Sequence, residues 1–488
     1  MSTFESFNPV TGESIASHAI TTKEEVDAAV ASAREVFPYW QAMGFKGRKK
    51  ALLKWNSYLL ENIDELVEIV SLETGKPTSD ATLEASLAFS HLGWAARHAE
   101  EIMRTSYRSP GALMANMSAT VERSPVGVVG VIGPWNYPVF TPMGSISYAL
   151  AAGNTVVFKP SEYTPAVGKF LADSFLEATG LNDVFTCVTG LGETGKYLCE
   201  SGVNKLAFTG STATAKRVAA TCALTMTPVV LECGGKDPVI VDRDANLKKA
   251  ADATIWSSMS NAGQTCIGAE RVYVHEDVAD AFIQECLRIA SEIKPGTPGL
   301  GNYGPATMPK QIAIIEGHIK DAIAKGGKVL LGGITSIRAP FVDPVIIADV
   351  PEDSTAITEE TFGPTLVINR VANMQEAIAL TNASRYGLGA SVWSRRHGKK
   401  IARSLDCGMV AINSAISFAA VASVPFGGVK DSGYGRIHGP EGILEFTYAR
   451  SVVRTRFYLP IAFTSFSRTA GNDKLIVRLN KILKGRLG

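Results

Sequence analysis

A cysteine, a glutamate and an asparagine stand in sequence surroundings that suit chemistry at a carbonyl group. Cys266 lies in SNAGQTCIGAER (260–271), among small and amide residues where a helical pattern breaks. Glu232 ends the apolar run TPVVLE, and such surroundings desolvate a carboxylate and raise its pKa toward that of a general base. Asn136 ends VIGPWN, where its amide could donate to a developing oxyanion. A thiol in a tight turn, a strand-end glutamate facing water and a turn asparagine are the ordinary alternatives.

The stretches that follow two predicted strands carry residues suited to a dinucleotide. Lys159, Ser161 and Glu162 come directly after NTVVF, where a lysine can reach a ribose or phosphate and a carboxylate can accept from ribose hydroxyls. Gly210 and Ser211 lie between LAFT and a helical segment, whose free N–H groups would suit a pyrophosphate. Surface charges at a helix start and a capped turn are the alternatives here.

A literal GxGxxG occurs at 190–195, GLGETG, and includes Gly192. The dinucleotide fingerprint also requires an acidic residue about 20 positions further on. The sequence has GSTATAK there, so this match alone favours a glycine-rich turn.

The elements that must position these residues form two α/β sets. Short β-rich runs alternate with helical segments between about 126 and 233, which predicts a parallel sheet with ligands beyond the carboxyl ends of its strands. A second set follows Cys266 and is predicted to form a separate lobe. Helical spacing over 23–39 and 49–72 predicts helices that pack on a larger body. The polar stretch 105–125 is interpreted as an extended excursion from the first lobe.

The composition argues against several classes of protein. The formal net charge is +1 over 488 residues, so no global field favours nucleic acid. The seven cysteines form neither CxxC pairs nor Cys/His clusters, which argues against a disulfide framework or structural zinc and fits a reducing compartment. The N-terminal residues lack the pattern of a signal peptide, and no apolar run is long enough to span a bilayer. We expect a cytoplasmic protein without metal or nucleic-acid partners.

With these motifs in order, the chain resembles the aldehyde dehydrogenase superfamily from NPVTGE (8–13) to FTYARSV (446–452). The motifs are ETGKP (73–77), PWNYP (134–138), KPSE (159–162), FTGS (208–211), LECGGKDP (231–238), NAGQTC (261–266), EETFGP (359–364), YGLGAS (386–391) and PFGG (425–428). One departure is Ala215, which stands where the family often has a glycine at the end of its phosphate turn. A methyl group there is expected to crowd the pyrophosphate slightly.

The resemblance implies an α/β fold with a Rossmann-like cofactor domain, an α/β catalytic domain and a small β oligomerisation arm. The implied boundaries are 1–106 with 126–234 for NAD binding, 235–437 for catalysis, and 107–125 with 438–460 for the arm. Residues 461–488 form a tail beyond these domains. A homodimer or homotetramer is implied as well.

The resemblance also implies residue roles. Cys266 attacks the aldehyde, Asn136 and the Cys266 backbone N–H form an oxyanion hole, and Glu232 activates the water that releases a carboxylic acid. The cofactor is NAD, with NADP as the alternative, because a carboxylate at Glu162 would repel a 2′-phosphate. The residues implied at the cofactor are Trp135, Lys159, Ser161, Glu162, Gly192, Gly210, Ser211, Glu360 and Phe362.

We expect the substrate to be an uncharged, apolar aldehyde, aromatic or aliphatic. Ser260 stands where family members that oxidise succinate semialdehyde often have an arginine. The late loop 413–428 contains no basic residue and offers Ile416, Phe418 and Phe426 to a pocket. Burying a substrate carboxylate without a charged partner would cost roughly several kcal/mol or more of binding free energy.

Three other classes stay open. A succinate-semialdehyde-type dehydrogenase would take its basic residue from another loop. The CoA-acylating branch of the superfamily tends to lack a carboxylate matching Glu232, and a non-enzymatic structural relative would be expected to lose Cys266 or Glu232.

The tail DKLIVRLNKILKGRLG (473–488) predicts a basic amphipathic helix. Its apolar face comprises Leu475, Ile476, Leu479, Ile482, Leu483 and Leu487, and its basic face comprises Lys474, Arg478, Lys481 and Lys484. Such a helix can lie on an anionic membrane surface. Packing on a partner subunit or on the body of the protein is the alternative.

Overall fold

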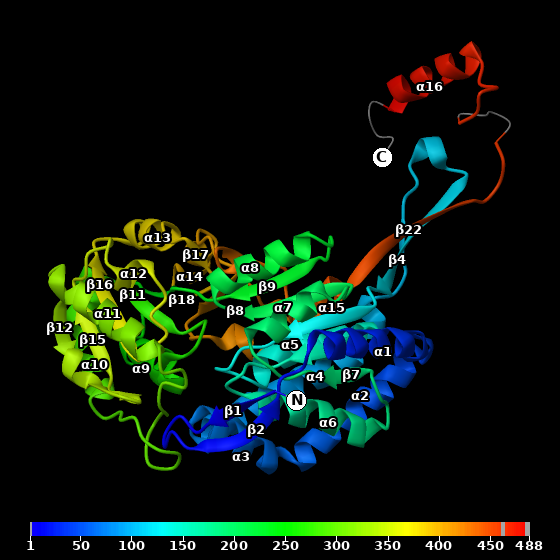
Figure 1. Ribbon diagram of the computed structural model, residues 1–488. Helices are drawn as coiled ribbons and strands as arrows, with labels where there is room; N and C mark the ends of the chain where they lie inside the picture. Colours follow the sequence, from blue (N-terminus) through cyan, green and yellow to red (C-terminus); the bar gives the residue numbers. More distant parts are fainter. Residues whose placement is uncertain (1, 460–463, 484–488) are drawn as a thin grey trace.

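The computed structural model describes residues 2–459 and 464–483, and its two large sheets carry two α/β lobes (Figure 1). The sheet of the first lobe has the order β21-β9-β8-β5-β6-β7. Its strands are β5 (Val128–Ile132), β6 (Thr155–Lys159), β7 (Phe185–Cys187), β8 (Lys205–Gly210), β9 (Val229–Cys233) and β21 (Gly433–Tyr434). The strands β5 to β9 run parallel, as predicted, and β21 adds to β9 in the antiparallel sense.

Both faces of this sheet are covered, which is why its strands are continuously apolar. Side chains alternate along a strand, so Val156 and Phe158 of β6 join one apolar cluster and Val157 joins another on the opposite face. The connecting helices are α5 (Phe140–Ala152), α6 (Pro165–Thr179), α7 (Gly192–Glu200) and α8 (Thr212–Ala223). The first lobe therefore has the doubly covered parallel sheet of a Rossmann-like domain.

The second lobe is built on a sheet with the order β12-β15-β16-β11-β10-β18-β19. Its strands are β10 (Asp237–Val241), β11 (Ala269–His275), β12 (Lys328–Leu331), β15 (Val345–Ala348), β16 (Thr365–Val371), β18 (Gly389–Trp393) and β19 (Met409–Ile412). All neighbours pair in parallel except β12, which pairs antiparallel with β15. The helices α9 (Leu247–Met259), α10 (Glu276–Ala290) and α11 (Gln311–Ala324) pack in this lobe.

Helices near the N-terminus cover the first sheet. The predicted pattern over 23–39 forms α1 (Lys23–Ala42), whereas the pattern over 49–72 is divided between α2 (Gly44–Glu61) and α3 (Ile63–Thr74). The break falls at Asn62, whose φ of −111° and ψ of 24° leave the helical region. The long helix α4 (Thr78–Ile102) packs against α5 and brings one of its faces to the interior between the lobes.

A three-stranded antiparallel sheet projects from the body of the molecule (Figure 1). Its strands are β3 (Ser106–Arg108), β4 (Met117–Pro125) and β22 (Thr447–Thr455). The predicted excursion over 105–125 is thus an extended ribbon joined by a strand from far along the chain. Its role in oligomerisation stays a prediction.

The tail forms α16 (Ala470–Leu483), as the amphipathic pattern predicts. Lys484 and Leu487 of that pattern lie outside the described residues. Val477 and Ile482 are more than half exposed in this structure. Among the helices that the structure describes, none combines the length and hydropathy needed to cross a membrane.

Candidate active site

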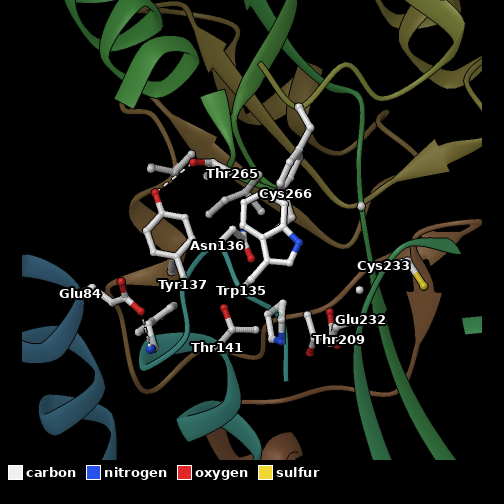
Figure 2. Close-up of a pocket in the computed structure, with 18 of the residues that line it drawn as sticks. Glu84, Trp135, Asn136, Tyr137, Thr141, Thr209, Glu232, Cys233, Thr265 and Cys266 are labelled. Atoms are coloured by element: carbon white, nitrogen blue, oxygen red, sulfur yellow. Dashed lines mark hydrogen bonds between the residues drawn. The ribbon is translucent and has the colours of Figure 1, made fainter. Parts of the chain in front are cut away.

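A cavity of about 430 Å³ between the lobes holds the three residues that the sequence singles out for chemistry (Figure 2). Glu232 comes from the end of β9, Asn136 from the loop after β5, and Cys266 from the loop between α9 and β11. Because β5 and β9 lie in one parallel sheet, their carboxyl ends meet at one edge. Other predicted residues that line the cavity are Trp135, Gly210, Ser211, Glu360, Phe362, Ile416 and Phe426.

The loop that presents Cys266 has an unusual backbone. Helix α9 ends at Met259, and Asn261, Ala262 and Gly263 then have φ values of 52°, 57° and 71°. Successive left-handed residues are costly and persist where the surroundings determine them, which is common at functional sites. An ideal Cβ at Gly263 would lie 2.1 Å from the carbonyl oxygen of Gly363, so this position requires glycine.

Buried amides hold this loop in place. The Asn261 side chain donates to the Asn136 carbonyl oxygen at 3.0 Å, and Gln264 donates through Nε2 to the Asn261 carbonyl oxygen at 2.9 Å. The Gln264 side-chain oxygen also accepts from the Thr307 N–H at 2.9 Å. The amides of NAGQTC thus fix the backbone that carries the thiol.

The Asn136 side chain keeps one donor free of this network. Its Nδ2 donates to the Gln264 carbonyl oxygen at 2.9 Å. A side-chain amide has two N–H donors, so the second is available to a reacting oxygen. This arrangement suits the predicted oxyanion role.

A buried ion pair underlies the Asn136 loop, and sequence reasoning assigned it no role. The Lys76 ammonium donates to Glu84 Oε2 at 2.7 Å and to the Asn136 carbonyl oxygen at 2.8 Å. Glu84 Oε1 accepts from the backbone N–H groups of Val139 and Phe140 at 2.8 and 3.1 Å. The ETGKP motif was the available signal, because it contains Lys76.

The Glu232 carboxyl is buried without a partner. Its residue is 3% exposed, and neither oxygen has a hydrogen-bond partner among the described residues. Burial raises the pKa of the Glu232 carboxyl well above its usual range, and the attraction of Arg436 opposes this. A carboxyl with a high pKa and no competing partner suits proton transfer.

The Cys266 thiol is also held in its protonated form. Burial raises the pKa of this thiol, and the carboxylates of Glu360, Asp237 and Glu232 raise it further. A thiolate nucleophile is the reactive form. The thiol must therefore lose its proton before it can attack.

Glu360 and Phe362 come from a loop that a second buried ion pair positions. Lys236 is hydrogen-bonded to Glu270, whose carboxylate accepts from the Thr361 and Phe362 N–H groups at 2.8 and 3.0 Å. Glu360 Oε1 accepts from the Gly235 N–H at 3.1 Å, and burial raises the pKa of Glu360 to about 8.

The wall of the cavity includes an aromatic pair. The rings of Phe362 and Trp135 meet edge to face with centroids 5.6 Å apart. Both residues were predicted at the cofactor, and Trp135 also lies edge to face with Tyr163 at 6.4 Å.

The remaining predicted cofactor residues are not among those that line the cavity. They lie at the same edge of the sheet. Lys159 ends β6, and its ammonium lies 3.9 Å from the Glu162 carboxylate. Ser161 hydrogen-bonds Glu162 at 3.3 Å, and Gly192 begins α7 with open space where a side chain would stand.

Two helix N-termini therefore face this edge beside a lysine and a carboxylate. Ser211 caps α8, since its hydroxyl oxygen accepts from the Thr214 N–H at 3.4 Å. Helix N-termini favour phosphate groups, so the residues present fit a dinucleotide. Ala215 is 1% exposed and joins the core cluster under α8, and its expected crowding of a pyrophosphate stays a prediction.

Phe418 is the predicted pocket residue that is not among those lining the cavity. Ile416 and Ala419 line the cavity, whereas the Phe418 ring lies 2.8 Å from an ideal Cβ at Gly389. The segment Ser417–Ala419 is a 3₁₀ turn, and Ile416 precedes it with a left-handed φ of 45°. The place of Phe418 in the substrate pocket stays a prediction.

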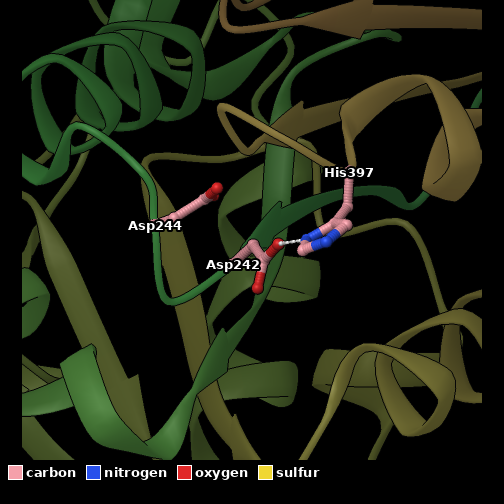
Figure 3. A group of neighbouring side chains, drawn as sticks. All are labelled: Asp242, Asp244 and His397. Carbon is pink, nitrogen blue, oxygen red and sulfur yellow. Dashed lines mark hydrogen bonds and ion pairs between the residues drawn. The ribbon is translucent and has the colours of Figure 1, made fainter.

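A separate group of acidic and histidine side chains lies in the second lobe (Figure 3). Asp242 accepts from Ser394 at 2.9 Å and contacts His397 Nδ1 at 3.1 Å, and Asp244 accepts from the Arg395 N–H at 2.9 Å. These donors already occupy the carboxylates. The group links the end of β10 to the loop after β18.

Comparisons with known proteins identify the family of this chain. The model of the aldehyde dehydrogenase family matches residues 1–452. The chain is 36% identical over 465 residues to 4,4′-diapolycopene aldehyde oxidase of Methylomonas sp., covering 94% of this chain and 87% of that protein. It is also 36% identical over 452 residues to the NADP+ succinate-semialdehyde dehydrogenase GabD of Escherichia coli K12, covering 90% of this chain and 92% of that protein.

The fold matches solved structures as well. The crystal structure of PnpE in complex with nicotinamide adenine dinucleotide superposes with a TM-score of 0.89 at 33% identity, covering 95% of this chain and 96% of that chain. The chain belongs to the aldehyde dehydrogenase family and is an NAD(P)-dependent oxidoreductase that acts on the aldehyde group.

Proposed function

We propose that this enzyme oxidises an uncharged, apolar aldehyde to its carboxylic acid through a thioester on Cys266. The observation that carries the chemistry is the coexistence of Cys266, the free donor of Asn136 and the unpartnered Glu232 carboxylate in one cavity. Each of the three supplies a separate part of the reaction: a nucleophile, a charge stabiliser and a base.

The residues act in sequence. The Cys266 thiol passes its proton to a water molecule and its sulfur bonds to the aldehyde carbon, while the Asn136 amide and the Cys266 N–H stabilise the resulting alkoxide. NAD(P), held at the strand edge, would supply the hydride acceptor, and loss of hydride from the alkoxide carbon would leave a thioester on the sulfur. Glu232 then takes a proton from water, whose oxygen displaces the thiolate and releases the acid.

The apolar substrate is inferred from the walls of the cavity. Leu83, Trp256 and Ile314 line it at exposed positions. Phe426 and Ile437 line it at buried positions, and Phe140 at a partly buried one. Apolar surface removed from water contributes roughly 25 cal/mol per Å². The diapolycopene aldehyde oxidase relative acts, by its name, on an apolar aldehyde.

A semialdehyde substrate is the second candidate, because one cation lines the cavity. Lys310 is exposed at its edge and could pair with a substrate carboxylate. An exposed pair of this kind is worth about 0–1 kcal/mol, so we place the semialdehyde below the apolar aldehyde. Hydrolysis is favoured over CoA acylation because Glu232 is present and neither of its carboxyl oxygens has a hydrogen-bond partner among the described residues.

An aldehyde panel tests the substrate proposal. Wild-type enzyme with fixed NAD is assayed for NADH appearance on hexanal, benzaldehyde, betaine aldehyde and succinate semialdehyde. The highest kcat/KM is expected for hexanal or benzaldehyde. If succinate semialdehyde instead gives the highest kcat/KM, and if Lys310→Met loses activity on succinate semialdehyde, the proposal is contradicted and the second candidate is supported.

We propose NAD as the preferred cofactor. The Glu162 carboxylate stands beside Lys159 at the end of β6, where it can accept from ribose hydroxyls and would repel a 2′-phosphate. Comparing kcat/KM for NAD and NADP tests this, and a clear preference for NADP would refute it. The Glu162→Gln variant should show a smaller difference between kcat/KM for NAD and kcat/KM for NADP.

The projecting sheet and the tail are proposed to contact partners. The sheet carries exposed Val452 and Val453 on its edge strand β22, and such an edge can pair with another copy of the chain. Sedimentation analysis should give a dimer or tetramer. A monomer at assay concentrations would refute the role of the arm.

For the tail, α16 combines exposed apolar residues with Lys474, Arg478 and Lys481, which suits an anionic membrane surface. Vesicles containing phosphatidylserine should sediment the full chain and not the 1–460 chain. Equal, negligible sedimentation of both chains would rule out the membrane contact.

A further inference from the structure

One buried histidine at the aldehyde cavity has a backbone conformation that its residue type disfavours. His438 lines the cavity beside Ile437 and Phe426 and is 1% exposed. Its φ of 59° and ψ of 165° fall in a region that is essentially restricted to glycine. Such strain persists where the surrounding structure determines it, and it concentrates at functional sites.

The imidazole of His438 is also unsatisfied. Neither Nδ1 nor Nε2 has a hydrogen-bond partner among the described residues. Buried polar atoms without partners are rare and costly in folded proteins. Strain and two unpaired nitrogens therefore coincide at a single residue, which is difficult to explain by packing alone.

The surroundings of His438 are shaped to accept its ring. The rings of Phe140 and Phe426 each lie 5.4 Å from it, centroid to centroid, and the His91 ring lies 4.1 Å away at 63°. Gly144 of α5 leaves the room that Nε2 requires, because an ideal Cβ there would lie 2.6 Å from that atom. The ring is thus held among aromatic side chains at the wall of the cavity.

Both histidines are neutral at neutral pH. Burial lowers the pKa of His438 well below its usual range and that of His91 to about 4. His91 lies on α4, on the face whose Glu84 and Leu87 line the cavity, and its Nδ1 meets the Tyr148 hydroxyl at 3.4 Å. A neutral imidazole offers one donor and one acceptor, which complements a hydroxyl group better than a carboxylate.

We infer that His438 is a hydrogen-bonding subsite for an uncharged polar group, such as a hydroxyl, at the end of the substrate remote from the aldehyde. This inference rests on the proposed aldehyde oxidation and refines its substrate to an apolar aldehyde with a neutral polar terminus. Phe140 and Phe426 would contact the apolar body of such a substrate, while the imidazole binds its terminus.

Matched aldehydes test the subsite. The pairs are 4-(hydroxymethyl)benzaldehyde with 4-methylbenzaldehyde, and the corresponding pair of longer cinnamaldehydes. The alcohol does not ionise, so each pair differs in hydrogen bonding and hardly in size. For wild-type enzyme we expect the hydroxymethyl compound to have about a tenfold higher kcat/KM in at least one pair. 4-Carboxybenzaldehyde should show no such advantage.

Two variants separate a binding role from a structural one. His438→Gly places the residue type that suits this backbone and removes the imidazole, so the selectivity ratio should fall to about one. His438→Asn retains a donor and an acceptor and should keep part of the ratio. His98→Leu, outside the cavity on α4, is the control and should keep the wild-type ratio.

A ratio near one for wild-type enzyme in both pairs, or a ratio that survives in His438→Gly, would overturn the subsite. Failure of wild-type enzyme to oxidise any of these aldehydes would instead overturn the proposed function on which the subsite rests. The two failures are thus distinct.

Discussion

Glu84 and Glu232 line one cavity and are 2% and 3% exposed, but their carboxylates have opposite surroundings. Glu84 accepts three hydrogen bonds, from Lys76 and from two backbone N–H groups, at 2.7 to 3.1 Å. Glu232 accepts none from the described residues. Burial is therefore the same while hydrogen bonding differs completely.

The difference shows how a buried acid can be assigned to structure or to chemistry. A fully paired carboxylate is held by its hydrogen-bond partners and orients its neighbours, here the loop that carries Asn136. An unpaired carboxyl costs stability and stays free to bind and release a proton. Position in the cavity does not separate the two glutamates, but their partners do.

The largest expected effect concerns the Cys266 thiol, which carries the thioester that the unpaired acid is proposed to hydrolyse. Cys266→Ala should lower kcat/KM by about 10⁴-fold or more, because the nucleophile is removed. The matched control is Cys233→Ala, which alters another cysteine that lines the cavity and should retain most of the activity. Near wild-type turnover by Cys266→Ala would refute the mechanism.

The next effect concerns stability and the paired acid. Glu84→Gln removes the partner of the buried Lys76 ammonium, and an uncompensated buried charge costs about 3–5 kcal/mol of unfolding free energy. Denaturant unfolding measures this loss. The exposed pair of Lys23 and Asp27 supplies the control, since Asp27→Asn should change stability by about 0.5 kcal/mol or less. Equal effects of the two substitutions would break the comparison.

The smallest effect is a pH-dependent gain in stability for Glu232→Gln, opposite in sign to the loss expected for Glu84→Gln. The pKa of Glu232 is raised in the native state, so the native state holds this proton more tightly than the unfolded chain does. Stability is therefore fully present below the ordinary pKa of 4.5 and is lost as the pH rises through the raised value. Glu232→Gln keeps the shape without the charge, and at pH 9 it should be more stable than wild type by on the order of 1 kcal/mol.

Thermal unfolding of the wild-type and Glu232→Gln enzymes from pH 5 to 9 provides the test. The two Tm values should agree near pH 5 and separate as the pH rises. Parallel curves, or a variant that is less stable at pH 9, would show that Glu232 is not an unpaired buried acid.

Much of this site follows from local sequence. Strand and helix alternation places the carboxyl ends of β5, β6, β8 and β9 at one edge, and the residues after those strands are the ones that face the cavity or its surroundings. The glycines and amides around Cys266 also indicate a tight, accessible turn. The local sequence pattern is enough to predict the position of a residue when that position depends only on the strand that precedes it.

The rest depends on contacts between segments far apart in the chain. Lys76 donates to the Asn136 carbonyl oxygen across 60 residues of sequence, and no hydrophobic period in the sequence predicts that contact. The orientation of Phe418 depends on a short 3₁₀ turn that the loop composition does not reveal. His438 is a further case, because its strain and its unpaired nitrogens exist only in the packed structure.

The central claim is that the unpaired Glu232 acts on the thioester after oxidation of the aldehyde. Rapid mixing of Glu232→Gln with NAD and benzaldehyde, followed by NADH absorbance, tests it most directly. The account predicts a burst of NADH stoichiometric with enzyme, then turnover that is about 10²–10⁴-fold slower than wild type. Unchanged steady-state turnover, or a loss of the burst together with the steady state, would contradict it.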